Sequence, residues 1–502
     1  MVPKGTGARC GVLSGVLLVA LAGCAAGPDF RPPAAPAVDG YRKDALPSAT
    51  VATKAPTGDA QRFVNGADVP TQWWTTFAND ELSRRITQAL AHSPSVASAQ
   101  AALRQAQENA NAARGSLFPS LDASASATRG NSNGLGTVAP GAQSVYTLYN
   151  AGAKVNYTLD LFGATRRGVE AESAVVDYQR FQLEGTYQTL AANVATASFR
   201  EASLRGQIRA TEEIIEVYNK ELKLVEAQNQ IGAKSLADVL VIRTQVATAA
   251  ATLPPLRQQL AQTQTQLAVY LGEFPSQSQL SALDLDALGL PHDVPVSLPS
   301  TLTRQRADVR AAEATLHQAT AKVGVATANL FPQITLSGNL GSSALHSGDL
   351  FSSGTKAWSI GANLLQPIFH GGSLRAQKRA AEAGLDKAAA DYEQTVLGAF
   401  QNVADALRAL ELDAENLQAQ AQAEQSAAQS LELVRIQYHN GSASYLQELD
   451  ATRQYQQTRL GLVQARAARL SDTAALYTAL GGGWKEDDAR SLAAAAETNS
   501  QK

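Results

Sequence analysis

The hydrophobic positions of the chain follow a seven-residue period over two long stretches. The first begins after Thr165 and contains no proline before Gln230, and it carries two interleaved series: Leu204, Thr211, Tyr218 and Val225, and Ile208, Ile215 and Leu222. The second carries Val396, Val403, Leu410 and Leu417, interleaved with Phe400, Leu407, Ala414 and Ala421. Such heptads predict helices that supercoil around partner helices. At ~1.5 Å per residue the first helix would reach ~100 Å, which is longer than a compact globule needs.

Four shorter segments instead alternate between apolar and polar residues, which is the period of a β-strand. They span residues 121–128, 149–161, 334–341 and 358–364, and Gly- and Ser-rich loops join them in two pairs. In the second segment Tyr149, Val155 and Tyr157 share one face, and the polar residues between them share the other. Strands of this length with one apolar face are typical of a transmembrane β-barrel. Four half-buried strands of a soluble sandwich would show the same alternation.

Four strands are too few to close a barrel. An open sheet edge in lipid would leave backbone groups without hydrogen bonds, so several copies of the chain must pool their strands. Two copies would make a barrel of about eight strands, whose interior is filled by side chains, whereas three would make one of about twelve with room for a water-filled lumen. Three copies are thus the smallest assembly that makes a pore, and we expect a mixed α/β membrane protein with a trimeric 12-stranded transmembrane β-barrel, four strands per chain.

The N-terminus has the layout of a bacterial lipoprotein signal. Lys4 and Arg9 precede a short apolar stretch over residues 11–20, which is typical of a secretory signal peptide. Leu21-Ala22-Gly23-Cys24 resembles the lipobox, in which the cysteine is lipidated and becomes the first residue of the mature chain. Each buried acyl CH₂ contributes about 0.8 kcal/mol, so several chains form a stable anchor. We expect a signal peptide over 1–23 and a palmitate-type lipid on Cys24, the alternative being a buried or reactive free cysteine. Ala25, where an acidic residue would favour the inner membrane, favours sorting to the outer membrane.

The chain also repeats itself. Leu117-Phe118-Pro119 recurs 213 residues later as Leu330-Phe331-Pro332, the segment 231–235 recurs 209 residues later as 440–444, and Leu271-Gly272 recurs as Leu480-Gly481. Near-constant offsets predict a tandem duplication. The expected organisation is a lipid anchor and extended tether over 24–72, repeat 1 over 73–271, a connector over 272–303, repeat 2 over 304–484 and a disordered polar tail over 485–502. Each repeat would contain a helix, two strands and a long helical hairpin.

Composition narrows the function classes. A net charge of −3, with 17% charged residues, offers no basic field for nucleic acid. After the signal there is no uninterrupted run of 18 apolar residues, so no membrane-spanning helix is expected. The six histidines are scattered, and no P-loop, G-x-S-x-G or G-x-G-x-x-G motif occurs. We expect no enzyme activity, no catalytic residue, no metal site and no cofactor other than the covalent lipid on Cys24.

Several segments, taken in order, resemble the TolC-like outer-membrane efflux proteins, and specifically their NodT-type lipoprotein branch. These are Cys24–Phe30, Trp73–Phe77, the segment 298–313 (LPSTLTRQRADVRAAE) and the two Leu-Phe-Pro turns. One departure is Ala307, where the family usually has proline, and its effect should be only a softer helix start. The resemblance implies a homotrimeric conduit whose 12-stranded barrel in the outer membrane continues into a long α-helical coiled-coil barrel, a large periplasmic part. It also implies a periplasmic adaptor (membrane fusion protein) and a proton-driven inner-membrane transporter of the resistance–nodulation–division (RND) class as partners.

The resemblance further implies a gate where the helical hairpins turn at the periplasmic end. Those turns are expected at Gly232 and Gly441, because glycine adopts the left-handed conformation that ends a helix without steric penalty. Asp238, Tyr438 and Asp450 match gate positions of the family. Three carboxylates around a threefold axis would repel one another and attract cations. For each aspartate the alternative is an exposed carboxylate on a helix surface.

Two further positions depart from the family pattern at this gate. Gln447 stands where a second ring aspartate is found, and Ala443 where an arginine can tie the gate shut, so we expect a weaker electrostatic latch. The expected function is passive efflux of small toxic compounds or drugs, with antibiotic resistance as the phenotype. Two alternatives remain: the outer-membrane duct of a type I protein secretion system, and a structural envelope lipoprotein.

Overall fold

A computed structural model describes residues 25–132 and 144–483. The signal peptide, Cys24 and the tail over 485–502 lie outside this range. The chain divides into two compact units. Unit 1 comprises the segment up to Pro33, Ala102–Gln179 and Ala311–Tyr392, and unit 2 comprises Ala34–Ala101, Arg180–Arg310 and the chain from Glu393. Each unit therefore combines segments from both sequence repeats.

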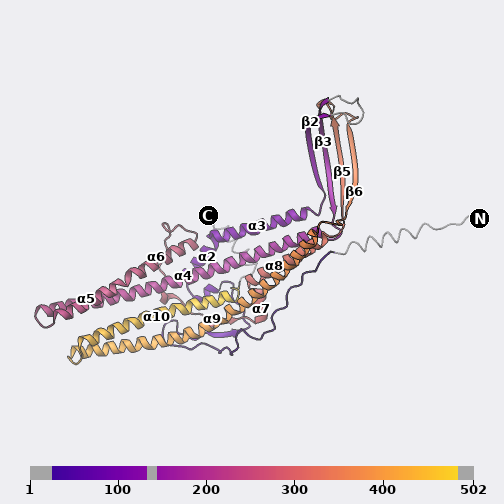
Figure 1. Ribbon diagram of the computed structural model, residues 1–502. Coiled ribbons are helices and arrows are strands. Elements are labelled where there is room, and N and C mark those ends of the chain that lie inside the picture. The colour runs from indigo at the N-terminus through magenta and orange to yellow at the C-terminus, as the bar shows by residue number, and fades with distance from the viewer. Residues whose placement is uncertain (1–24, 133–143, 484–502) are drawn as a thin grey trace, which may run out of the picture. The chain divides into compact units, whose positions relative to one another are not determined.

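Unit 1 contains a four-stranded antiparallel sheet in the order β2-β3-β5-β6 (Figure 1). Its strands are β2 (Ser120–Ser132), β3 (Ser144–Leu159), β5 (Gln333–Ala344) and β6 (Lys356–Leu365), and a short 3₁₀ turn (Ser347–Asp349) lies between the last two. All four predicted strands are confirmed. The first half of the chain provides one hairpin and the second half the other, and the two pair through β3 and β5. One edge of β2 and one edge of β6 are left without a partner strand.

The register of the sheet keeps the apolar residues on one face. Cross-strand rows of this face are Ala153–Leu340–Trp358 and Tyr157–Leu336–Ala362. On the other face, Asn150 links three strands: its side-chain amide donates to Ser126 Oγ (3.3 Å) and accepts from Ser343 Oγ (2.6 Å). Because a shift of one residue would reverse the two faces, the pattern specifies the register strongly.

The two long helices predicted from the seven-residue period are confirmed. They are α4 (Ala164–Gln230) and α9 (Ser373–His439), of 67 residues each. The side chains of the leading series in α4, Leu204, Thr211, Tyr218 and Val225, are all buried. Val403, Leu410 and Leu417 of α9 are completely buried. α3 (Pro94–Gly115) and α8 (Ala307–Ala328) lead into the two hairpins, and α8 starts where it was expected despite the missing proline.

In unit 2 each long helix returns through a second helical segment (Figure 1). α9 is followed by the continuous α10 (Tyr445–Ala479), whereas α4 is followed by α5 (Leu236–Ala251) and α6 (Leu253–Tyr270). The interruption between α5 and α6 has a local cause, because Pro254 and Pro255 lack the N–H groups that would continue the ladder of α5. The remaining elements are a 3₁₀ turn (Trp73–Phe77), α2 (Asp80–His92), a second 3₁₀ turn (Leu285–Ala287) and α7 (Pro299–Gln305).

The segment expected to be an extended tether is partly integrated into unit 2. β1 (Arg62–Asn65) pairs in parallel with β4 (Asp293–Val296), which comes from the expected connector. The buried Arg469 of α10 donates to the carbonyl oxygens of Thr57 (2.9 Å) and Asp59 (2.7 Å). The buried Gln61 amide donates to Pro291 O and Thr473 Oγ1, both at 3.2 Å. The expectation was wrong here because buried polar side chains satisfy this backbone, so the segment needs little apolar content of its own.

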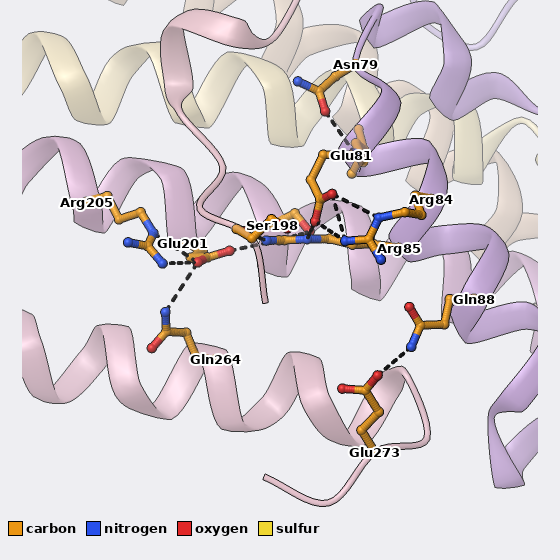
Figure 2. A network of polar contacts seen from close by, with 12 residues as sticks. Asn79, Glu81, Arg84, Arg85, Gln88, Ser198, Glu201, Arg205, Gln264 and Glu273 are labelled. Carbon is orange, nitrogen blue, oxygen red and sulfur yellow. Dashed lines mark hydrogen bonds and ion pairs between the residues drawn. The ribbon is translucent and has the colours of Figure 1, made fainter. Parts of the chain in front are cut away.

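A buried ion-pair network fixes α2 against α4 (Figure 2). Arg85 of α2 and Glu201 of α4 are both fully buried, and Arg85 Nη1 lies 2.8 Å from Glu201 Oε2. Arg85 also donates to Ser281 O (2.6 Å) and to Glu81 Oε1 (3.0 Å), while Arg205 donates to Glu201 Oε1 (2.8 Å). The charges therefore compensate one another, as a buried pair requires.

Among the described residues, one helical stretch, Leu236–Tyr270, is long and apolar enough to cross a membrane by length and composition. The sequence-based prediction missed this stretch because Thr and Gln residues interrupt its apolar run. Val239 and Ile242 of this stretch belong to the buried cluster that includes Tyr218 and Val225 of α4. Val239 and Ile242 therefore pack inside unit 2, although only 11% of the apolar window is buried in a single chain.

Candidate functional site

The turns that join the long helices to their return helices have the same backbone geometry. Gly232 in the first turn has φ +78°, and Gly441 in the second has φ +74°. In the first, Ala233 N donates to Gln228 O (2.9 Å), and in the second Ser442 N donates to Gln437 O (2.8 Å). These bonds satisfy carbonyl groups left free at a helix end, and the left-handed glycine makes them possible. We refer to the two turns, residues 231–235 and 440–444, as the helix tips.

Asp238, a predicted gate residue, caps α5 in the structure. Ser235 N and Ser235 Oγ donate to Asp238 Oδ2 at 2.9 and 2.7 Å, and Asp238 N donates to Ser235 Oγ at 3.2 Å. The hydrogen bonds from Ser235 hold the pKa of Asp238 below its ordinary value. Ser444 and Gln447 form the same capping box at the start of α10, with Ser444 N 2.7 Å from Gln447 Oε1. Asp238 and Gln447 therefore occupy equivalent positions of the two repeats.

Tyr438, the predicted gate tyrosine, lies in a contact between the two tips. Lys234 Nζ, from the first tip, is 5.5 Å from the ring centroid of Tyr438 and 5.5 Å from that of Tyr445. The two tyrosine rings are 5.8 Å apart. A cation within about 6 Å of a ring centroid is attracted by the ring quadrupole. Sequence reasoning missed Lys234 and Tyr445, although Lys234 stands 209 residues before Ala443 and so occupies its equivalent position in repeat 1.

Asp450 lies apart from this contact. It is on the exposed face of α10, where Arg453 Nη2 donates to its Oδ1 at 3.0 Å. Within the described part of one chain, no hydrogen bond or ion pair joins Asp450 to Asp238 or Tyr438. The structure thus brings together Tyr438 and the first tip, but it leaves the two predicted carboxylates in separate local contacts.

A partly buried acidic cluster lies beside the tips. Glu221 of α4 faces Tyr445 and Glu448 of α10, and Arg435 of α9 lies 3.6 Å from Glu448. Burial and the neighbouring Glu448 raise the pKa of Glu221 to about 7. Burial also raises the pKa of Glu448, against the opposing effect of Arg435. These acids carry no sequence motif, and only the packing of α4, α9 and α10 brings them together.

The raised pKa of Glu221 has a consequence for stability. An unfolded chain would release this proton near pH 4.5 and the folded chain near pH 7, so stability falls as the pH rises through that window. Glu221→Gln should remove this part of the slope and raise the thermal midpoint above that of the wild type at about pH 8. Melting curves at a series of pH values test this. The control is Glu216→Gln, five residues earlier on α4. Glu216 is exposed and its hydrogen bond with Lys220 lowers its pKa, so its replacement should leave the slope between pH 4.5 and 7 in place. An unchanged slope in Glu221→Gln contradicts the assignment.

In unit 1, the residues that follow Cys24 are docked at the junction between β3 and α4. Ala26 N donates to Phe162 O (2.9 Å), and Asp29 forms an ion pair with Arg167 of α4. The Phe30 ring stacks on His317 of α8 with centroids 4.3 Å apart. These contacts hold residues 26–30 beside the foot of the sheet.

A close backbone approach explains one glycine of this segment. Gly27 has φ +91°, and a Cβ atom added there would lie 2.5 Å from Gly324 Cα of α8. Any larger residue at position 27 would therefore displace the segment. Within the described ranges, no group of three or more His, Cys, Asp or Glu side chains is placed to hold a metal ion.

Comparison with known proteins places this architecture in a family. The family model described as "Outer membrane efflux protein" matches residues 85–273 and 298–482. The probable efflux pump outer membrane protein TtgC of Pseudomonas putida is 32% identical over 472 residues, which cover 93% of this chain and 94% of TtgC. The probable outer membrane lipoprotein SilC of Salmonella typhimurium is 29% identical over 419 residues, covering 83% of this chain and 89% of SilC.

The fold agrees with the same assignment. The solved structure of the outer-membrane channel OprN superposes with a TM-score of 0.82 at 28% identity, covering 92% of this chain and 100% of that one. The match includes both repeats, and with the relatives it places the protein in the outer membrane. The two matched ranges, the paired hairpins and the long helices lead to one conclusion: the chain belongs to the outer membrane efflux protein family.

Proposed function

We propose that the protein is the outer-membrane channel of a tripartite efflux system. It is a passive homotrimeric conduit that receives small toxic compounds or drugs from a periplasmic adaptor and an inner-membrane RND transporter and releases them outside the cell. One observation carries this proposal: a sheet with one apolar face, one polar face and two free edges is attached to helices of 67 residues. Membership of a family of transport conduits, rather than enzymes, supports it.

The sheet supports a barrel shared by three copies. Ile360 is 83% exposed and Trp358 75% exposed on its apolar face, a surface that lipid would cover. The polar face, with Asp122, Lys154 and Asn339 in one cross-strand row, would line an aqueous lumen. Pairing β6 of each copy with β2 of the next removes both free edges, as a membrane requires. Three copies then make a 12-stranded transmembrane barrel that continues into a coiled-coil barrel in the periplasm.

The return helices carry unpartnered apolar surface that fits the same assembly. Leu236, Leu240 and Val241 of α5 are exposed in a single chain. Sustained apolar surface on long helices calls for neighbouring helices, which two further copies would provide. This surface also accounts for the apolar composition of α5 and α6 without a membrane-spanning helix.

The lipid anchor belongs to the same proposal. The docked segment Ala25–Phe30 would hold an acylated Cys24 beside the foot of the sheet, at the membrane boundary. The signal peptide over 1–23 would be removed. The mass of the N-terminal tryptic peptide tests the anchor, because an unmodified Cys24 thiol in the mature chain contradicts it.

We also infer that the helix tips form the gate. Ala443 lacks the cation that the family places there, and Lys234 provides one from the equivalent position of repeat 1. Its contacts with Tyr438 and Tyr445 tie the two hairpins of one copy together. Asp450, exposed on α10, is then the carboxylate available to a ring around the threefold axis, while Asp238 has a capping role as well.

Conductance in planar bilayers tests the function and the gate together. Purified wild-type protein should run as a trimer in detergent and form ion-conducting pores, whereas a structural lipoprotein would conduct nothing. Deletion should increase drug sensitivity, and loss of a secreted polypeptide instead would favour the protein-secretion duct.

Lys234→Met should raise the resting conductance of the channel. A cation–π contact contributes about 1–2 kcal/mol when partly desolvated, enough to change an opening equilibrium by roughly 5–30-fold. Lys223→Met, which removes an exposed lysine of α4 away from the tyrosines, should conduct like the wild type. Equal conductance of all three proteins rejects Lys234 as a latch while leaving the channel function intact.

A further inference from the structure

The junction between the two hairpins of one chain shows how two hairpins fit together at their feet. β3 and β5 pair without interruption from Tyr149–Ala344 to Leu159–Ile334. Directly beyond the end of this ladder, Phe162 stacks on Phe331 with centroids 4.7 Å apart and an interplanar angle of 17°. Phe331 belongs to the second Leu-Phe-Pro turn, and Phe162 to the link that leads from β3 into α4.

The first Leu-Phe-Pro turn has matching backbone hydrogen bonds. Among the described residues of one chain, however, no aromatic ring stacks on its phenylalanine, Phe118. Phe118 N donates to Gly115 O at 3.1 Å, as Phe331 N donates to Ala328 O at 3.0 Å. The two turns therefore present their phenylalanines in the same way at the foot of β2 and of β5. Within one chain, however, the Phe118 side chain is 70% exposed, compared with 39% for Phe331.

The partner that Phe118 lacks has a counterpart at the other free edge of the sheet. The link from β6 into α9 contains Ile368 and Phe369, as the link from β3 into α4 contains Leu161 and Phe162. Ile368 is 93% exposed and Phe369 86% exposed, although both are large and apolar. Each free edge of the sheet thus ends in exposed apolar side chains that correspond to the Phe162 and Phe331 pair at the β3–β5 junction.

We propose that Phe118 of one copy packs against Ile368 and Phe369 of the next copy. The contact between copies then reproduces the contact between Phe331 and Phe162 inside each chain, and it closes the assembly beneath the strands. The proposal rests on the trimer described above and adds to it the residues that recognise the neighbour. Its occupant is a second copy of this chain, because only another copy offers the complementary edge.

The strand pattern is compatible with this contact. The three in-chain ladders place mostly apolar residues opposite apolar residues. Extension of this pattern across the junction between copies requires the apolar face of β6, with Ala362 and Leu364, to continue into the apolar face of β2, with Leu121 and Ala123. A shift by one residue would place apolar side chains of one copy on the polar face of the other. The aromatic contact at the foot therefore selects among the registers that keep the two faces separate.

Cysteine cross-linking tests the contact in the full-length protein. In detergent-solubilised Phe118→Cys/Phe369→Cys, a short bis-maleimide should convert monomer bands on a denaturing gel into dimer and trimer bands. Each single variant, and the pair Phe118→Cys/Phe351→Cys, should remain monomeric on the gel. Phe351 is a suitable control because it is 76% exposed but lies in the loop between β5 and β6.

The outcomes separate this contact from the trimer itself. Protein that has trimer mass in detergent but gives no cross-link with Phe369 overturns the proposed contact and leaves the proposed function standing. Protein that is monomeric in detergent contradicts both the proposed contact and the proposed function. As a second measurement, Phe118→Ala and Phe369→Ala should each lower the temperature at which the trimer dissociates, whereas Phe351→Ala should not. Dissociation of all three variants at the wild-type temperature also overturns the proposal.

Discussion

Replacing Arg85 with methionine should lower the free energy of unfolding by about 3–5 kcal/mol, because it leaves a fully buried carboxylate without its main partner. Glu201 would keep the ion pair with Arg205, whose side chain is partly exposed, and a long hydrogen bond from Gln264 (3.4 Å). The bonds from Arg85 to Ser281 O and to Glu81 would be lost as well. Arg85 joins α2 to Glu201 of α4 (Figure 2) and to Ser281 in the segment that follows α6, so the effect should reach beyond one helix turn.

The neighbouring arginine is the matched control for this experiment. Arg84 pairs with Glu81 at 2.7 Å, but its side chain is 53% exposed. Exposed pairs contribute about 0–1 kcal/mol, so Arg84→Met should be close to neutral. Denaturant unfolding in detergent, followed by circular dichroism, compares the two variants. Equal midpoints for Arg84→Met and Arg85→Met would show that the buried pair does not stabilise unit 2. The double variant Arg85→Met/Glu201→Leu should recover part of the loss, because it removes both buried charges.

An arginine in place of Ile360 should prevent stable insertion into the outer membrane. Ile360 stands opposite Gly338 on the apolar face of the sheet, where we place lipid. An arginine facing the middle of a bilayer costs a β-barrel about 2–4 kcal/mol, and three copies would multiply that cost in one assembly. The expected result is loss of the protein from the outer-membrane fraction and loss of the detergent-stable trimer.

Ser359→Arg provides the control, since Ser359 is the preceding residue of β6 and faces the other way, in the polar row with Asn339. It adds the same charge to the same strand, but on the side we assign to the lumen. Normal fractionation and altered ion selectivity are expected for it. If Ile360→Arg inserts as well as Ser359→Arg, the apolar face does not contact lipid and the barrel assignment fails.

The parts of the fold that were predictable from sequence are those governed by a period. Seven-residue spacing reported α4 and α9, and two-residue spacing reported all four strands of the sheet. Both periods follow from backbone geometry, so burial of one face leaves a regular mark on the chain. The repeated segments likewise indicated where the two helix tips lie, because a left-handed glycine is needed at each turn.

The ordered structure of residues 48–65 and the contacts at the helix tips have no comparable pattern in the sequence. Arg469 bonds to Thr57 of the expected tether across 412 residues of sequence, and Gln61 within the tether bonds to Pro291 across 230. No local pattern reports such bonds. The local contacts of the predicted gate residues could not be read from the sequence for the same reason. Asp238 could be identified as a carboxylate near a turn, but its capping bond to Ser235 and the approach of Lys234 to Tyr438 depend on the folded tips.

Local periodicity was therefore enough to establish the long helices, the two-faced strands and the expectation that one chain cannot close its own sheet. Repeated motifs at near-constant offsets indicated the duplication. Folding established which buried charges compensate each other, which acid near the tips holds its proton until about pH 7, and that Phe118 and Phe369 end the free edges without a partner. The reason is physical: a repeating face is recorded in neighbouring residues, whereas a pairing of distant side chains exists only after the chain has brought them within a few ångströms.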